Sequence, residues 1–515
     1  MDNRPSYAHI RNAQARGVCP WCSHSTEGLT EDMCPECGNN VRALKPLGPR
    51  DPGSPGVASL CSLIAVALIL IVAVVQQRVE SAFAKQATPA AATSVELPSG
   101  QFELTAKAFV KIASISPDPA GKQQIGAQAT GTLDAQAATP ADKLRVAMVS
   151  AELEGDEKAL ARLDKLEAEP DLDAKLAEDS KTLRALYAGE PLTPEVQTRL
   201  EKNHGWIGKL AATHGKPDTD LARAPLIGGG GKLMALVFGA VAGIIIVFIA
   251  GFTCFIVALV KIAGRTLRPR FIPPTPGGSI AIEMVVVFVL GFLALKGLSL
   301  AAEHLLGPKG AVWFSLAAQW CLLFILLWPA LRGWRGGLSA LGWNKGQGVL
   351  TEIGCGLFGY LACLPLVLFG AIVSIILMLT YQAVQVAMGH KAPPAPDNPV
   401  FELASGKGGV WLIVVIYILA SVWAPIMEES IFRGALYRHL RSHWPWFPAA
   451  AVSAIGFGLM HNYPLLMLGP VMSLGFGFAL IREWRGSLIA SMTAHCVHNA
   501  VVLAVVLFAV HLIGG

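Results

Sequence analysis

A series of long apolar runs is the feature that most constrains this chain of 515 residues. A helix that crosses the roughly 30 Å hydrocarbon core needs about 20 apolar residues, because every backbone polar group must be satisfied within the segment. The chain is 53% hydrophobic and only 15% charged, which is typical of a membrane protein. We therefore predict an all-α polytopic protein with about nine spans, at 57–75, 233–262, 280–300, 311–331, 352–381, 410–424 (continuing into 425–440), 448–463, 464–481 and 487–512.

The basic residues predict one orientation in the membrane. They cluster before the first span, after the second, fourth and sixth, and before the ninth, and all clusters share one side if the N-terminus is cytoplasmic. We expect a multi-pass protein of a bacterial cytoplasmic membrane with its N-terminus inside. A net charge of +5 is too small for a nucleic-acid-binding surface, so no nucleic acid partner is expected.

A polar, Ala-rich segment, 77–225, separates the first two spans and would be extracytoplasmic. It begins with a linker over 86–99, has a strand-like pattern over 101–115, and is otherwise helical in pattern. It shows no catalytic constellation, so we interpret it as a spacer or a protein-contact domain. A second linker is expected near 393–398. The predicted organisation is a module at 1–50, a first transmembrane helix at 57–75, the insert at 77–225, a second transmembrane helix with a basic loop at 226–275, and a helical bundle at 280–512.

Burying an ionisable residue inside a span costs roughly 2.5 kcal/mol or more. Several such residues in one bundle therefore indicate a function. Glu429 and Arg433 are four residues apart and share a helix face, whereas Glu428 points about 100° away. His495 and Asn499 are likewise one turn apart, with His498 as a competitor for the role of His495. The predicted site comprises Glu428, Glu429, Arg433, His461, His495 and Asn499.

The order Glu-Glu-x-x-x-Arg, Phe-x-x-x-His and His-x-x-x-Asn on successive apolar helices resembles the CPBP family of intramembrane endopeptidases. This family includes the type II CAAX prenyl endopeptidases and bacteriocin-processing or self-immunity proteins. The resemblance covers about 280–512, including the turn at 341–343. It implies that Glu428 and His461 activate water, that His495 and Asn499 stabilise the oxyanion, and that Glu429 and Arg433 support them. The implied substrate is a membrane protein or a lipid-anchored peptide.

Other interpretations remain open at this stage. Glu428, His461 and His495 could hold a catalytic zinc ion, since three such ligands and a water form a catalytic centre. Glu429 and Arg433 could be a structural ion pair. The fold could serve a non-catalytic scaffold or immunity-type protein, or a transporter with a proton relay, although no inverted repeat is visible.

Four cysteines near the N-terminus form two C-x-x-C knuckles, Cys19 with Cys22 and Cys34 with Cys37. Four thiolates at this spacing can converge on zinc, so we predict a structural zinc ribbon. A redox dithiol is the alternative, but two matched pairs without a βαβ pattern disfavour it. So small a module is expected to need its metal to fold.

Overall fold

The computed structural model describes residues 7–29, 33–39, 48–86, 98–137, 139–169, 172–264, 266–389 and 409–514. Within these ranges the chain forms helices and no strand, apart from two isolated backbone bridges. The predicted all-α class is therefore confirmed. The predicted linker at 393–398 lies outside the described residues, as does most of the one at 86–99.

Seven helical segments of the described chain are long and apolar enough to cross a membrane. The protein is therefore an integral membrane protein. The segments are Pro55–Gln76 in α2 (Pro55–Gln86), Ala224–Ala263, which includes α10 (Gly230–Ala263), Ile280–Gly307 and Lys309–Leu331 in and after α11 (Ile280–Ala318), Val349–Ala387 (α14), Gly409–His443, and Leu488–His511 in α21 (Leu488–Gly514).

The expected count of about nine is not confirmed, because two predicted spans correspond to shorter helices. α19 (Trp446–Leu459) has 14 residues and α20 (Gly469–Arg485) has 17. At 1.5 Å per residue neither reaches the length of a typical span. α20 also ends in Arg482, Glu483 and Arg485, so its last turn is charged.

The helix that carries the two adjacent glutamates runs without a break from Gly409 to His443. Pro425 lies inside this helix, where a proline removes one backbone donor, and the turns on either side of it are wider than α-helical ones. Two π-helical stretches, η2 (Leu419–Trp423) and η3 (Glu429–Leu436), flank the short α17 (Ala424–Glu428). α16 (Gly409–Ile418) and α18 (Tyr437–His443) complete the segment.

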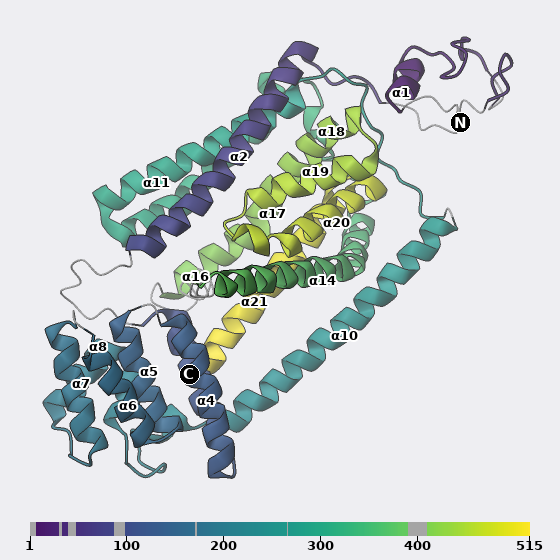
Figure 1. Ribbon diagram of the computed structural model, residues 1–515. Coiled ribbons are helices and arrows are strands. Elements are labelled where there is room, and N and C mark those ends of the chain that lie inside the picture. The colour runs from purple at the N-terminus through teal and green to yellow at the C-terminus, as the bar shows by residue number, and fades with distance from the viewer. Residues whose placement is uncertain are drawn as a thin grey trace. The chain divides into compact units, whose positions relative to one another are not determined.

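α2 and α11 lie side by side in one compact unit that also contains α17 to α20 (Figure 1). That unit comprises 1–79, 246–383 and 414–501. Buried residues of α2 and α11 share an apolar core with η3 and α19, including Ile69, Val285, Phe432 and Phe457. The segment that carries the glutamates is thus held in a packed core from several sides.

Buried ion pairs fasten the helix ends of this unit. Arg438 binds Asp51 at 2.7 Å, Arg441 binds Glu483 at 2.9 Å, and Arg485 binds Glu352 at 2.7 Å. Arg438 and Arg482 also donate to backbone carbonyls of the loop around α13 (Gly337–Leu341), namely those of Ala340 and Leu341. Four of the basic residues used to predict orientation therefore lie at one end of the unit, namely Arg438, Arg441, Arg482 and Arg485. The side of the membrane on which this end lies stays a prediction.

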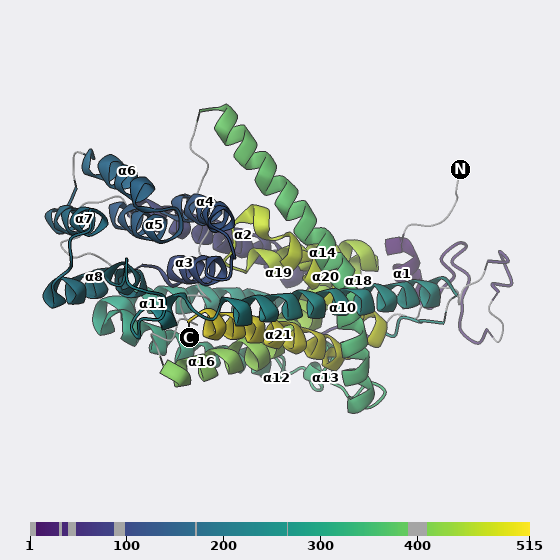
Figure 2. The same ribbon diagram turned by 90° about the horizontal axis from the view of Figure 1, so that it is seen from below.

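The segment between the first two spans is a bundle of helices (Figure 2), and its buried side chains form an apolar core of their own. The expected strand at 101–115 is wrong, because α3 occupies it. Its buried residues Phe102, Ala106, Val110 and Ala113 recur every three or four positions, which is one face of a helix. The helices are α3 (Gly100–Ala113), α4 (Pro119–Gln136), α5 (Pro140–Leu153), α6 (Asp156–Glu167), α7 (Ala174–Tyr187), α8 (Pro194–Ala212) and α9 (Ala224–Ile227).

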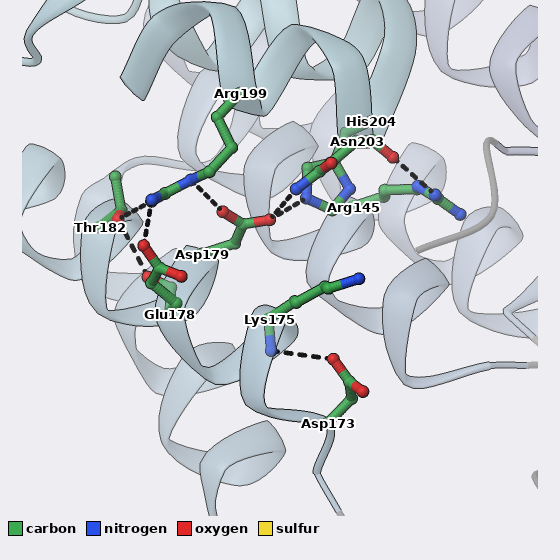
Figure 3. Close-up of polar contacts among 9 residues, drawn as sticks. All are labelled: Arg145, Asp173, Lys175, Glu178, Asp179, Thr182, Arg199, Asn203 and His204. Atoms are coloured by element: carbon green, nitrogen blue, oxygen red, sulfur yellow. Dashed lines mark hydrogen bonds and ion pairs between the residues drawn. The ribbon is translucent and has the colours of Figure 1, made fainter. Parts of the chain in front are cut away.

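A polar cluster joins α7 to α8 inside this bundle (Figure 3). Asp179 is buried and accepts hydrogen bonds from Asn203 at 2.8 Å and from His204 at 3.2 Å. Arg199 donates to the other oxygen of Asp179 at 3.1 Å and also pairs with Glu178. A buried carboxylate is stable only when such partners are present, so the cluster fixes the register of the two helices.

Candidate functional site

Glu429 lies at the centre of a fully buried polar cluster. Its Oε1 atom is 3.0 Å from Nη1 of Arg433, and both side chains are 0% exposed. The same oxygen is 3.2 Å from Nδ1 of His495 on α21. A buried charge is tolerated only when it is paired and hydrogen-bonded, so Glu429, Arg433 and His495 depend on one another.

Aromatic rings surround the guanidinium of Arg433. Its central carbon lies 4.3 Å from the ring centre of Phe457 and 5.2 Å from that of Phe478. Its Nη2 atom donates to the Gly475 carbonyl at 2.9 Å. Cation–π contacts of this kind are stronger where water is absent, so the surroundings hold Arg433 rigidly and Glu429 with it.

Glu428 has a different environment from its neighbour. Its side chain is 23% exposed, and its Oε2 atom lies 3.7 Å from Nε2 of His495. No described cation pairs with it at closer range, whereas Glu429 has Arg433. Of the two adjacent carboxylates, that of Glu429 is therefore held in an ion pair, whereas that of Glu428 is partly exposed and has a buried oxygen, Oε2, without a hydrogen-bond partner.

His495 contacts both glutamates, one through each ring nitrogen. A carboxylate oxygen can only accept, so Nδ1 carries the hydrogen and donates a hydrogen bond to Glu429. Nε2 consequently faces Glu428 with a lone pair in the neutral ring, or with a proton in the imidazolium. The ring also stacks on Phe478, with centres 4.8 Å apart. His498, the competing histidine, instead lies 3.5 Å from the hydroxyl of Tyr360.

His461 follows the end of α19 and packs on the same phenylalanine as His495. The ring centre of Phe457 is 4.6 Å from that of His461 and 5.8 Å from that of His495. The Nδ1 atom of His461 donates to the Phe457 carbonyl at 2.8 Å, since a carbonyl can only accept. In the neutral ring this bond fixes the tautomer and leaves Nε2 as an acceptor.

Asn499 is bound to backbone one turn further along α21. Its Nδ2 atom donates to the Ala420 carbonyl at 2.7 Å. In the π-helical turn η2 the N–H of Ala424 bonds to the Leu419 carbonyl, five residues back. The next donor in that pattern would be Pro425, which has no N–H. Asn499 therefore supplies the hydrogen bond that the proline cannot make.

The structure thus brings Glu428, Glu429, Arg433 and His495 into direct contact and joins His461 to them through Phe457. Sequence reasoning missed Ser421 and Trp423, which lie seven and five residues before Glu428. Both are buried, and among the described residues Ser421 Oγ and Trp423 Nε1 have no hydrogen-bond partner. Buried polar atoms without partners are rare and often mark places where a ligand or water binds. Their position on the glutamate helix was the available signal.

The loop at 341–343 also supports the glutamate helix. The indole nitrogen of Trp343 donates to Ser430 Oγ at 3.0 Å. Gly342 has φ +117°, and a side chain there would collide with the guanidinium of Arg482. This glycine is thus required by both its backbone conformation and a close approach.

The four N-terminal cysteines form a second candidate site. Their sulfur atoms all lie within 4.8 Å of one another, with Cys19 to Cys37 and Cys22 to Cys34 both at 3.6 Å. Two 2.3 Å bonds at a tetrahedral angle place sulfurs roughly 3.8 Å apart, so the group fits a metal of this geometry. Hydrogen bonds from the backbone and side chain of Asn39 lower the pKa of Cys37 to about 6, whereas burial raises the pKa of Cys19, so Cys37 forms a thiolate more readily than Cys19.

The two knuckles have matching backbone bonds. The N–H of Cys19 donates to His24 O and that of Cys34 to Asn39 O, while Ser23 and Gly38 donate back to the respective cysteine carbonyls. Ser23 and Gly38 also share a positive φ, at 61° and 68°. Two equivalent turns that face each other present four sulfurs from two sides, which is the arrangement of a structural metal site.

The buried site defines a class of protein: a membrane-embedded enzyme-like bundle with an acid–histidine centre. Residues 410–501 match the family model described as type II CAAX prenyl endopeptidase Rce1-like. The chain therefore contains an Rce1-like domain, which extends from α16 into α21 and includes all six predicted site residues. At the family level this match supports an intramembrane endopeptidase. Comparisons with curated proteins and with solved structures gave no match.

Proposed function

We propose that the protein hydrolyses a peptide bond of a membrane protein or lipid-anchored peptide, at Glu428. The observation that carries the proposal is the contrast between adjacent carboxylates: Glu429 is sealed in a pair with Arg433, whereas Glu428 is partly exposed and faces His495. A structural role would not require a second, unpaired glutamate beside the first. A hydrolase needs one such group to take a proton from water.

In the proposed reaction Glu428 accepts a proton from a water molecule whose oxygen attacks the substrate carbonyl carbon. The resulting oxyanion needs a donor in a site from which bulk water is excluded. His495, oriented by Glu429, supplies one from Nε2 when protonated. When the C–N bond breaks, the proton held by Glu428 passes to the leaving amine, so the products are a carboxylic acid and an amine. His461 Nε2 assists as a second acceptor for the water.

The assignment of Asn499 to the oxyanion is revised in this proposal. Its amide group donates to Ala420 and holds the turn that precedes Glu428. Asn499 thus acts as a positioning residue, and Ser421 and Trp423 offer unpartnered donors on the same helix for the substrate backbone.

A catalytic zinc ion remains the second version of the mechanism. Among the described residues, the four cysteines are the group with metal-ligand spacing, and Glu428, His461 and His495 are not brought to that spacing. This favours water activated directly by Glu428. We propose zinc for the cysteine site, where it would stabilise the fold of the module and take no part in the reaction.

A cleavage assay in lipid vesicles tests the proposal. The purified protein would be incubated with lipid-anchored and transmembrane peptides, and the products identified by mass spectrometry. We expect Glu428→Gln and His495→Gln to lower cleavage by about 100-fold or more. The matched control is Glu303→Gln, which removes an exposed carboxylate from α11. Cleavage unchanged in Glu428→Gln would contradict the proposed site, and a folded wild type without cleavage would favour a non-catalytic scaffold.

Two further parts of the proposal concern the orientation of the chain in the membrane and a partner of the helical insert. We propose that the N-terminus lies in the cytoplasm of a bacterial cell, on the basis of the clustered basic residues at one end of the bundle. We also propose that the helical insert at 98–227 contacts a protein partner, since it has its own core and carries no catalytic group.

A further inference from the structure

One buried amide outside the Rce1-like domain contacts the backbone beside His461. Gln76 lies near the end of the apolar part of α2 and is 4% exposed. Its Nε2 atom donates to the Met460 carbonyl at 3.2 Å. Met460 directly precedes His461, so the bond acts on the peptide group that joins the two residues.

Gln76 occupies a position where an apolar residue would be expected. Up to Gln76, the buried apolar residues of α2 are Ala58, Ala65, Ile69 and Val72, which form one helix face and pack on the core that contains Phe457 and Met460. Gln76 continues this face four residues after Val72. Packing alone would be served by leucine or methionine, whereas a buried amide is costly unless its hydrogen bonds are used.

The Met460 carbonyl needs an external donor because of where it lies. α19 ends at Leu459, and the last carbonyls of a helix have no partner within it. His461 donates two bonds to the same helix end, from its N–H to Gly458 O at 2.9 Å and from Nδ1 to Phe457 O, and its carbonyl accepts a bond from the N–H of Tyr463 at 3.0 Å. Gln76 thus gives this turn a hydrogen bond from a different helix.

We infer that Gln76 is a positioning residue for His461, and that α2 is a working part of the active site although it lies outside the matched domain. The expected effect of Gln76 on kcat rests on the proposed function. The claim that Gln76 holds His461 in place does not. Gln76 fixes the peptide plane of Met460 and His461, and through it the direction of the His461 ring towards the water site. α2 itself is anchored at its other end by the ion pair between Asp51 and Arg438.

The test uses the full-length protein with Gln76→Met, which keeps length and burial but cannot donate. We expect kcat to fall roughly tenfold with KM unchanged, since the loss of one hydrogen bond to a positioning group affects the reaction and not substrate binding. The matched control is Ser62→Ala, which removes the 3.0 Å contact from the same helix to His439. We expect kcat of this variant to equal that of wild type.

A second measurement does not depend on proteolysis. Diethyl pyrocarbonate modifies accessible imidazole nitrogens, and mass spectrometry gives the rate at His461. We expect this rate to rise about threefold or more in Gln76→Met, because the turn opens more often, and to stay at the wild-type value in Ser62→Ala. Equal rates in wild type and Gln76→Met would overturn the inference. A wild type that cleaves nothing would contradict the proposed function and would leave this comparison readable.

Discussion

The Nδ1 atom of His495 lies 3.2 Å from the Oε1 atom of Glu429. This contact joins α21 to the helix that carries both glutamates, and it directs the other ring nitrogen towards Glu428 at 3.7 Å. One imidazole therefore links the carboxylate that is paired with Arg433 to the partly exposed carboxylate of Glu428. The two adjacent glutamates should respond differently to the same substitution.

Glu429→Gln should lower both stability and activity, whereas Glu428→Gln should lower activity alone. Removing the Glu429 charge leaves the buried Arg433 without its carboxylate, at a cost of about 3–5 kcal/mol in the free energy of unfolding. Thermal unfolding in detergent would measure the difference. The double variant Glu429→Met/Arg433→Met should be more stable than Arg433→Met alone, and equal stability of the two would show that the pair is not coupled.

Asn499→Ala should behave as the loss of a helix contact. We expect the free energy of unfolding to fall by about 1–2 kcal/mol, because the Ala420 carbonyl is left without a donor beside Pro425. An oxyanion donor would behave otherwise, with a loss of about 100-fold or more in kcat and no change in stability. Unfolding and kinetics of the same preparation distinguish the two roles.

The helical insert should become less stable in acid. Burial lowers the pKa of His204 below its usual value, although the hydrogen bond to Asp179 opposes this shift. The unfolded chain then binds more protons than the folded one, so stability falls as the pH drops through about 6.5. Burial alone would raise the pKa of Asp179, but His204, Asn203 and Arg199 together lower it, so a second loss follows below about pH 4.

Hydrogen exchange of the full-length protein measures this effect in peptides from 98–227. Protection should be greatest above about pH 7, after correction for the intrinsic exchange rate. His204→Gln should remove the step near pH 6.5 and keep the lower one. An unchanged profile in this variant would assign the step to another group.

Metal analysis should give one zinc ion bound by the cysteine module. Cys19→Ser/Cys34→Ser removes one ligand from each knuckle and should lower bound zinc by about one equivalent per chain. Cys321→Ser, at an exposed single cysteine in the apolar region, is the matched control and should retain the metal. A remaining equivalent in the double variant would point to a second site and to the metal version of the mechanism.

Much of the candidate site was predictable because the spacing of residues along one helix determines which side chains share a face. Glu429 and Arg433, four residues apart, form the expected ion pair, and α21 brings His495 beside them. Spacing alone could not separate His495 from His498, since both lie near one face. Their different neighbours, the glutamates and Tyr360, depend on how α21 packs.

Other features depended on structure that no local pattern encodes. The contact of Asn499 with Ala420 requires a π-helical turn, and such turns have no clear sequence signature. Gln76 stands at the edge of an apolar run, where a polar residue is ordinary, so its burial could not be foreseen. The strand expected at 101–115 failed because every second residue there is apolar and the helical period fits as well.

Arginine contacts at one end of the membrane bundle limit where the chain can accept insertions. Arg438 and Arg482 bind the carbonyls of Ala340 and Leu341, so a lengthened loop at this place would disconnect two buried guanidinium groups together. Just ahead of Asp51, Gly48 and Arg50 donate hydrogen bonds to the carbonyls of Pro273 and Gly277 instead. An insertion near the cysteine knuckles, by contrast, would leave both guanidinium contacts in place.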